Sequence, residues 1–262
     1  MIYIVGGNGF VGSAVVRQCK QRKLTYRIVT RDNFEQFAGS SCAVLINANG
    51  NSKKFMADRE PLWEFDASVR SVCQYLTQIQ AEKYIQLSSC DVYPDCSHPE
   101  QTKEDQPIAV DRQCTYGFHK YLAELCVQHY AKKWLILRMG GFVGPGLKKN
   151  AVYDILHGGP LWLEEGSELQ FISTDAAAGI ILDLALSEHT HEILNLCGDG
   201  TIKIRDIMQA FKCSVAQKPD TPRVRYEVNI DRLRQICTVE KTQDAVFSFL
   251  DRVAALRDQD ND

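Results

Sequence analysis

The N-terminal half of the chain alternates short apolar runs with stretches whose apolar residues recur at helical spacing. The run at residues 2–5, which is followed by two glycines, predicts a buried strand. Further strands are predicted at residues 26–30, 43–47, 84–88 and 134–138, and helices at 13–23, 62–79 and 116–132. Strands rich in Val, Ile and Leu that alternate with helices indicate a parallel sheet covered on both faces.

The pattern changes after about residue 146, where segments become shorter and prolines more frequent. Two helices are still predicted, at residues 175–186 and 242–256. We therefore expect an α/β protein with a doubly wound parallel sheet and a small C-terminal lobe. The sheet domain would span residues 1–146, with later returns to it, and residues 147–262 would mainly form the lobe.

The seven residues that directly follow the first strand, Gly6 to Gly12, contain the spacing G-x-G-x-x-G from Gly7 to Gly12. Glycine allows a tight turn, close approach of a pyrophosphate to the backbone, and close packing of helix on strand. The motif lies between a predicted strand and a predicted helix whose N-terminus would face the phosphates, which favours a dinucleotide-binding (Rossmann) loop over a structural turn. The residues expected at the cofactor are Gly6, Gly9, Phe10, Val11 and Gly12.

The end of the second strand bears on the choice of cofactor. An acidic residue there holds the ribose hydroxyls of NAD, whereas an arginine accommodates the 2′-phosphate of NADP. Counted from Gly12, Thr30 or Arg31 falls at this place and Asp32 lies one step past it, so both kinds of side chain are present. Arg31 favours NADP, with NAD as the alternative, unless the pair is simply a solvated turn.

Three further residues indicate hydride chemistry. Ser89 ends a predicted strand at the edge where open parallel sheets bind ligands. Tyr116 and Lys120 are four residues apart and share one face of a predicted helix. We expect the lysine to lower the pKa of the tyrosine, which would act as acid/base, while the serine hydrogen-bonds the reacting oxygen.

The order of these motifs resembles the extended short-chain dehydrogenase/reductase family of nucleotide-sugar epimerases, dehydratases and reductases. The resemblance rests on GGNGFVG, INANG, LSSCDVYPD, YGFHK and LRMGGFVGPG, and it continues through FISTD and NLCGD. It implies that Ser89, Tyr116 and Lys120 are catalytic and that Lys120 also contacts the cofactor ribose. It further implies that Asn47 and Ala48, with Gly50, line the nicotinamide side. The likeness suggests a homodimer formed through residues 62–79 and 116–132.

The chain departs from this family at two expected substrate positions. Gly141 stands where members often carry an asparagine that contacts the substrate. Asp91 stands where sugar dehydratases carry a glutamate that assists elimination, although it could equally stabilise a turn. Lys149 is a third candidate, either for a substrate diphosphate or as part of a solvated basic loop.

The predicted reaction is hydride exchange between a nicotinamide and a carbinol or ketone carbon, most readily on a nucleotide sugar. Because Asp91 is not a glutamate, epimerase or reductase is favoured over dehydratase. Two alternatives stay open: a reductase of a non-sugar carbonyl, and a regulatory protein that binds NAD(P) without catalysis. His119 is expected to be an ordinary helix residue that points away from the Tyr116/Lys120 face.

Composition limits the remaining possibilities. A net charge of −3 and an isoelectric point near 6.1 give no support to nucleic-acid or membrane-surface binding. No apolar run approaches the roughly 20 residues that span a bilayer, and the N-terminus lacks the features of a signal peptide. The ten cysteines contain no Cys-x-x-Cys pair and are expected to be reduced thiols. We therefore expect a cytoplasmic protein without a metal site.

Overall fold

A computed structural model describes residues 1–51 and 54–259, with side chains as far as residue 256. The chain forms two compact units, each taken separately below. The sheet unit consists of Met1–Asp95, Glu104–Met139 and Ala178–Leu196. The second unit consists of Cys96–Lys103, Gly140–Ala177 and Cys197–Asp262.

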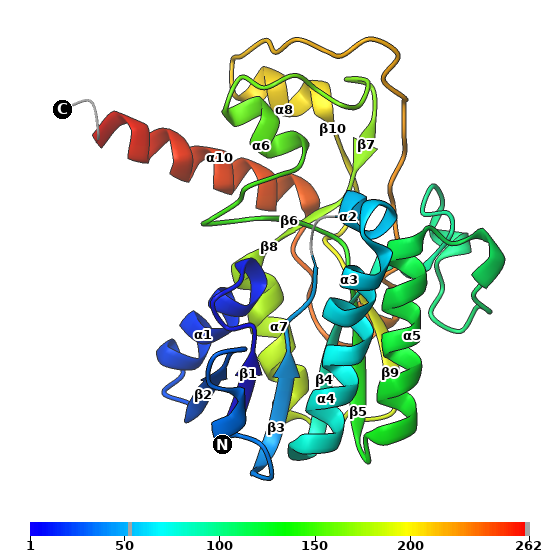
Figure 1. Ribbon diagram of the computed structural model, residues 1–262. Helices are drawn as coiled ribbons and strands as arrows, with labels where there is room; N and C mark the ends of the chain where they lie inside the picture. The colour runs from blue at the N-terminus through cyan, green and yellow to red at the C-terminus, as the bar shows by residue number, and fades with distance from the viewer. Residues whose placement is uncertain (52–53, 260–262) are drawn as a thin grey trace. The chain divides into compact units, whose positions relative to one another are not determined.

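The sheet unit is built on a six-stranded parallel sheet in the order β2-β1-β3-β4-β5-β9 (Figure 1). The strands are β1 (Ile2–Val5), β2 (Tyr26–Val29), β3 (Ser41–Asn47), β4 (Gln80–Ser89), β5 (Trp134–Met139) and β9 (Glu192–Leu196). The five strands expected from the apolar pattern are confirmed, as is the doubly wound fold class. The apolar pattern did not predict β9, an edge strand whose first two residues are half-buried.

The direction of winding reverses between β1 and β3. From β1 the chain moves outward to β2 and then crosses back over β1 to β3. Right-handed crossovers therefore place α1 (Phe10–Gln21) on one face, and α4 (Ser71–Gln78) and α5 (Thr115–Tyr130) on the other. In such sheets the point of reversal leaves a crevice at the carboxyl ends of the strands.

Alternate residues of the strands form the core beneath α4 and α5. Tyr3 and Val5 of β1 and Leu45 of β3 join one cluster with Val72 of α4 and Val127 of α5. Each of these five side chains is at most 5% exposed. Burying one aliphatic side chain of this kind contributes about 1.5–3 kcal/mol, so the alternation itself fixes which face of each strand meets the helices.

The long helix expected at residues 62–79 is present but not regular. It consists of α3 (Pro61–Phe65), a π-helical turn η2 (Asp66–Arg70) and α4. A further short helix, α2 (Lys54–Arg59), precedes it. The sheet unit also contains the short turns η1 (Phe34–Gln36), η3 (Cys90–Val92) and η5 (Val110–Arg112).

The second unit contains two small sheets and several helices. Its strands are β6 (Gly141–Val143), β7 (Glu168–Leu169), β8 (Phe171–Ser173) and β10 (Ile202–Lys203), which pair as β6-β8 and β7-β10. Its helices are η4 (Pro99–Gln101), α6 (Ala151–Leu156), α8 (Ile204–Ala210), α9 (Asp231–Ile236) and α10 (Thr242–Gln259). The helix α7 (Thr174–Leu186) begins in this unit and ends in the sheet unit.

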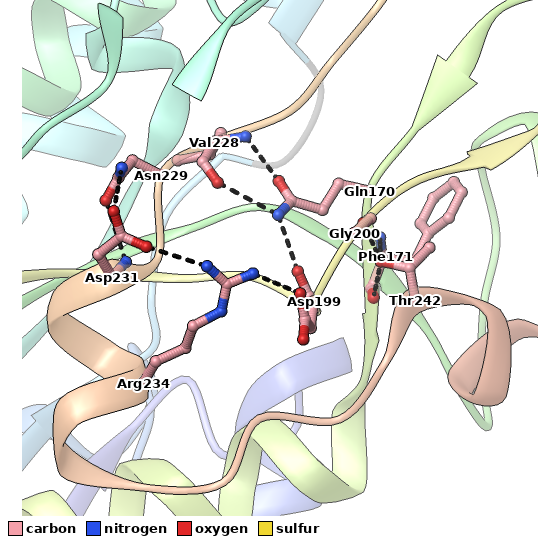
Figure 2. A network of polar contacts seen from close by, with 10 residues as sticks. Gln170, Phe171, Asp199, Gly200, Val228, Asn229, Asp231, Arg234 and Thr242 are labelled. Atoms are coloured by element: carbon pink, nitrogen blue, oxygen red, sulfur yellow. Dashed lines mark hydrogen bonds and ion pairs between the residues drawn. The ribbon is translucent and has the colours of Figure 1, made fainter. Parts of the chain in front are cut away.

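A network of polar side chains ties the C-terminal part of the second unit to its strands (Figure 2). The Gln170 amide donates to the carbonyl oxygens of Gly198 and Val228, and its oxygen accepts from the Val228 amide. Thr242 Oγ1 donates to the carbonyl of Phe171, 3.0 Å away. These bonds satisfy buried polar groups in a region with little regular secondary structure.

No helix in the described part of the chain is long and apolar enough to cross a membrane. None of the ten cysteines, all of which lie within the described residues, forms a disulfide.

Candidate active site at the carboxyl edge of the sheet

The carboxyl ends of β1, β3 and β4 lie along one edge of the sheet unit. Val5 pairs with Asn47, and Asn47 pairs with Gln86, so the loops that leave these strands emerge close together. Ser89 ends β4 at the same edge, where it pairs with Met139 at the end of β5. The sheet topology thus brings the glycine loop and the serine predicted from the sequence to one crevice.

The glycine loop connects β1 to α1 by a tight backbone turn. Gly6 has φ +74°, and its carbonyl accepts a 2.9 Å hydrogen bond from the Gly9 amide. A Cβ at Gly12 would lie 2.2 Å from the Gly6 carbonyl oxygen, so only glycine lets α1 pack this closely on the loop. Phe10 and Val11 form the first turn of α1, which contains no acidic residue. The exposed amides of this helix end suit the phosphates of a dinucleotide.

The turn after β2 presents Arg31 and Asp32 to solvent. Asn33 shapes this turn, because its Oδ1 accepts from the Thr30 amide at 2.7 Å and its Nδ2 donates to the Ile28 carbonyl at 3.0 Å. Neither side chain of the exposed pair is therefore needed to hold the turn, which leaves both available to a ligand.

The end of β3 places Asn47 inside the sheet unit. Its Nδ2 donates to the Tyr84 hydroxyl at 2.9 Å and to Gln86 Oε1 at 3.1 Å, and the side chain is fully buried. Ala48 follows in the loop, where its amide donates to the Val5 carbonyl at 2.9 Å. Asn47 thus anchors the loop, and its own polar atoms are already occupied by protein partners.

Ser89 and Asp91 form a hydrogen-bonded pair at the end of β4. Ser89 Oγ donates to Asp91 Oδ2 at 2.8 Å and accepts from the Asp91 amide at 3.2 Å. Lys54 on α2 forms an ion pair with the other carboxylate oxygen, Oδ1. Sequence reasoning missed this lysine, since the fold alone brings α2 to the end of β4.

Tyr116 lies in the first turn of α5, with Lys120 one turn further on. Both are buried, and Lys120 Nζ lies 5.7 Å from the centroid of the Tyr116 ring. A Cβ on Gly50 would lie 2.6 Å from Nζ, so the glycine leaves room for the ammonium group. A hydrogen bond joins the Tyr116 side chain to that of Ser89. The three residues expected to be catalytic therefore lie together.

The expected lowering of the Tyr116 pKa is wrong for this structure. Burial raises the pKa of Tyr116, the carboxylates of Asp91 and Glu64 raise it further, and the hydrogen bond with Ser89 offsets only part of this. Burial also lowers the pKa of Lys120, against the opposing effect of nearby carboxylates. Desolvation and the two carboxylates thus dominate the pKa of Tyr116, and sequence spacing could not reveal either.

Gly117 is a site residue that the sequence reasoning passed over. A Cβ there would lie 2.0 Å from the Asp91 carbonyl oxygen. The glycine lets the start of α5 lie directly against η3, which brings Tyr116 next to Ser89. Its position inside the YGFHK motif was the available signal.

A buried ion pair lies beneath the site. The Arg138 guanidinium binds both carboxylate oxygens of Glu124, with Nη2 at 2.8 Å from Oε2, and both side chains are at most 2% exposed. Ser88 Oγ donates to Glu124 Oε1 at 2.5 Å. Ser88 and Ser89 point to opposite sides of β4, so Ser88 joins this support while Ser89 remains at the site.

His119 is not the ordinary helix residue that was expected. It is buried, and its Nδ1 donates to Oε2 of the fully buried Glu64 on α3. Nothing in the sequence spacing pairs a residue of α3 with one of α5.

Gly141 and Lys149 lie in the second unit. A Cβ at Gly141 would lie 2.6 Å from the Gln170 carbonyl oxygen, so the pairing of β6 with β8 leaves no room for the family's asparagine at this position. Lys149 is exposed in the loop before α6. Within residues 1–51 and 54–259, no group of three or more His, Cys, Asp or Glu side chains could hold a metal ion.

Comparison with known proteins agrees with this architecture. The model of the NAD dependent epimerase/dehydratase family matches residues 2–156. No curated protein matches the chain.

Solved structures of similar fold include a UDP-glucuronic acid 4-epimerase variant from Bacillus cereus in complex with UDP-4-deoxy-4-fluoro-glucuronic acid and NAD. Its TM-score is 0.78 at 16% identity, covering 97% of this chain and 99% of that one. UDP-glucose 4-epimerase from Thermus thermophilus, in complex with NAD, has a TM-score of 0.76 at 17% identity, covering 95% and 97%. An NAD-dependent NDP-hexosamine 5,6-dehydratase of tunicamycin biosynthesis has a TM-score of 0.78 at 17% identity, covering 95% and 96%.

Proposed function

The chain belongs to the NAD dependent epimerase/dehydratase family, and from that premise we propose that it is an NAD(P)-dependent enzyme acting on a nucleotide sugar. The reaction is hydride exchange at a carbinol or ketone carbon of the sugar. The observation that carries the proposal is the meeting of Ser89, Tyr116 and Lys120 at the sheet edge that also bears the glycine loop.

Each residue has a definite task in this reaction. Tyr116 Oη takes the proton of the substrate hydroxyl in the oxidative direction and returns it in the reductive direction. Ser89 hydrogen-bonds the same substrate oxygen and so fixes it against the tyrosine. Lys120 keeps a positive charge near the phenol. A bound nicotinamide supplies the acceptance and donation of hydride.

The tyrosine needs help to ionise at neutral pH. Its pKa is raised by burial and by the two carboxylates that face it, so the phenol is protonated in the unliganded site. The positive charge on the nicotinamide ring of a bound oxidised cofactor would oppose the carboxylates, so formation of the base would depend on cofactor binding. Proton transfer is thereby confined to the loaded enzyme.

A nucleotide sugar is the best-supported substrate class. The Bacillus cereus and Thermus thermophilus neighbours are UDP-sugar epimerases. On the substrate side we place Asp91, Gly141 and Lys149. Epimerase or reductase is favoured over dehydratase, because the Asp91 carboxylate is held by Ser89 and Lys54 instead of standing free for elimination.

For the cofactor we propose NADP, with NAD as the alternative. Arg31 is exposed at the end of β2 and free of any role in holding its turn. The neighbours named above contain or depend on NAD, so the two cofactors have to be compared by direct binding measurements. Cytoplasmic location stays a prediction.

A first experiment tests the reaction itself. The purified protein is incubated with a panel of nucleotide sugars, with and without added NADPH or NADH. Net consumption of cofactor means a reductase, and isomerisation without consumption means an epimerase. No change with any sugar would favour a non-sugar carbonyl substrate or a protein that only binds the cofactor.

Tyr116→Phe tests the mechanism. Loss of the hydroxyl removes the acid/base, so turnover should fall by at least about a hundredfold. Cofactor affinity, measured by fluorescence or calorimetry, should change little. Undiminished turnover of this variant would refute the assigned mechanism.

A further inference from the structure

A buried carboxylate is bonded to His119, the residue directly before Lys120 on α5, and has no task in the mechanism above. Glu64 on α3 has no exposed surface. Its Oε2 accepts a hydrogen bond from His119 Nδ1, and its Oε1 accepts one from Ser68 Oγ. His119 is 6% exposed and Ser68 is 2% exposed, so the whole cluster is closed to bulk solvent.

The cluster is attached to the helix that carries the acid/base. His119 directly precedes Lys120 on α5, and both α3 and η2 pack against α5. Ser68 belongs to the π-helical turn η2, and the Phe65 ring meets the His119 ring edge-on at a centroid distance of 5.4 Å. π-Helical turns inside helices are frequent at functional sites. The carboxylate is therefore held in place from two elements.

Three carboxylates act electrostatically on Lys120, two of them also on Tyr116, and two of the three are paired with an arginine or a lysine. Glu124 is bound by Arg138, and Asp91 is paired with Lys54. Among the described residues, the ion pair recorded for Glu64 is with an imidazole, which is cationic only when protonated. A buried carboxylate without such a cation acts strongly on the charges around it.

The charge of Glu64 changes the pKa of both Tyr116 and Lys120. Its charge raises the pKa of Tyr116, together with Asp91 and with the Cys114 thiol. It is also the largest influence opposing the burial that lowers the pKa of Lys120, ahead of Glu124 and Asp91. Geometry and electrostatics thus point to the same residue.

We propose that Glu64, anchored by His119 and Ser68, is a positioning residue that sets the pH range in which Tyr116 and Lys120 work. The inference rests on the proposed function, since it concerns the acid/base of that reaction. Glu64 touches no reacting atom and acts only through its charge on α5.

The test is the pH profile of kcat/KM for oxidation of the hydroxyl, with saturating cofactor. In the native chain the rate should rise as Tyr116 ionises and fall as Lys120 loses its proton. Removing a negative charge lowers the pKa of every group that faced it. In Glu64→Gln both limbs of the profile, the rise at low pH and the fall at high pH, should therefore move to lower pH by about one unit.

Two matched variants separate the charge from other effects. Glu104→Gln removes another buried carboxylate of the sheet unit, one that accepts from the Asn195 amide, and should leave both limbs in place. His119→Gln keeps a side-chain N–H donor for Glu64 and should also leave them in place. A shift in either control as large as that of Glu64→Gln would overturn the proposal, as would unmoved limbs in Glu64→Gln itself.

A second variant that removes the same charge keeps the test valid if Glu64→Gln does not fold. Glu64→Met combined with His119→Phe replaces both partners by apolar side chains, which buried sites tolerate better than one orphaned partner. It should show the same acid shift of both limbs. Tyr116→Phe is measured alongside. Full activity of Tyr116→Phe would refute the proposed function. If Tyr116→Phe is inactive but the pH profile of Glu64→Gln does not shift, only the role of Glu64 is refuted.

Discussion

At the scale of single residues, the site depends on where side chains are missing as much as on where they act. The absence of a side chain leaves room for the Gly6 carbonyl at Gly12, for the Lys120 ammonium at Gly50 and for the Asp91 carbonyl at Gly117. In each case a Cβ would lie within 2.6 Å of the neighbouring atom. Real Cβ atoms do not come this close to backbone atoms, so Gly12 and Gly117 fix contacts on which the site depends, whereas at Gly50 the neighbour is the movable end of the Lys120 side chain.

The glycine of α1 allows a direct prediction. Gly12→Ala adds a methyl group 2.2 Å from the Gly6 carbonyl oxygen and should lower the free energy of unfolding by about 1–3 kcal/mol, with loss of cofactor affinity. Gly179→Ala, in α7, is the control. Its new Cβ would meet only the far end of the Arg22 side chain at 3.5 Å, so it should stabilise by up to about 1 kcal/mol. Urea denaturation of both variants measures the difference.

Arg31 carries the prediction about cofactor choice. If its guanidinium binds the 2′-phosphate, Arg31→Ala should weaken NADPH binding about 10- to 100-fold and leave NADH binding nearly unchanged. Arg27→Ala removes another exposed arginine, from β2, and should alter neither affinity. The prediction of NADP would be contradicted if the native chain bound NADPH and NADH equally well and Arg31→Ala changed neither affinity.

At the scale of elements, α5 is the helix around which the site is organised. Its first turn supplies Tyr116, its second supplies Lys120, and its third supplies Glu124, which holds Arg138 of β5. Residues three or four apart share a helical face, so the catalytic face and the anchoring face are continuous. The ion pair with β5 therefore holds the catalytic turn in place from below.

Breaking this ion pair should be costly. Arg138→Met leaves the Glu124 carboxylate buried without its guanidinium, and we expect the free energy of unfolding to fall by about 3–5 kcal/mol. Ser88→Ala removes one hydrogen bond to the same carboxylate and should cost only about 1 kcal/mol. Combining Arg138→Met with Glu124→Leu should recover most of the loss. A mild effect of Arg138→Met alone would show that the pair is not needed for stability.

At the scale of the whole molecule, the helices on the α5 side of the sheet unit expose large apolar side chains. Leu62 and Trp63 on α3 are 83% and 47% exposed, and Leu125 on α5 is 42% exposed. The two helices pack against each other, and a large exposed apolar surface is typical of a protein interface. They suit the homodimer that we propose.

Sedimentation can check this assembly. The native chain should have the mass of two copies, and Leu62→Glu combined with Leu125→Glu should reduce it to one copy by placing charges in the interface. Leu186→Glu changes a leucine at the end of α7 whose exposure, 53%, lies between those of Leu62 and Leu125, and should leave the mass unchanged. A native chain that sediments as a monomer at all concentrations would contradict the dimer.

The amino-acid sequence by itself determined the parts of the protein that rest on local periodicity. The strands at β1 to β5, the helices α1, α5, α7 and α10 and the glycine loop were all readable, because each depends on neighbours within a few residues. The three residues Ser89, Tyr116 and Lys120 could be named from motif spacing. Their chemical roles, and those of Asp91, Gly141 and Lys149, stay predictions.

Only the tertiary structure decided how these residues are balanced electrically. The pKa of Tyr116 is raised where the sequence suggested that it would fall, because burial and the carboxylates of Glu64 and Asp91 act through space. The partner of His119 lies 55 residues away, on a helix interrupted by a π-helical turn. Residues this far apart meet only when sheet and helices pack, so no spacing in the sequence records their distance.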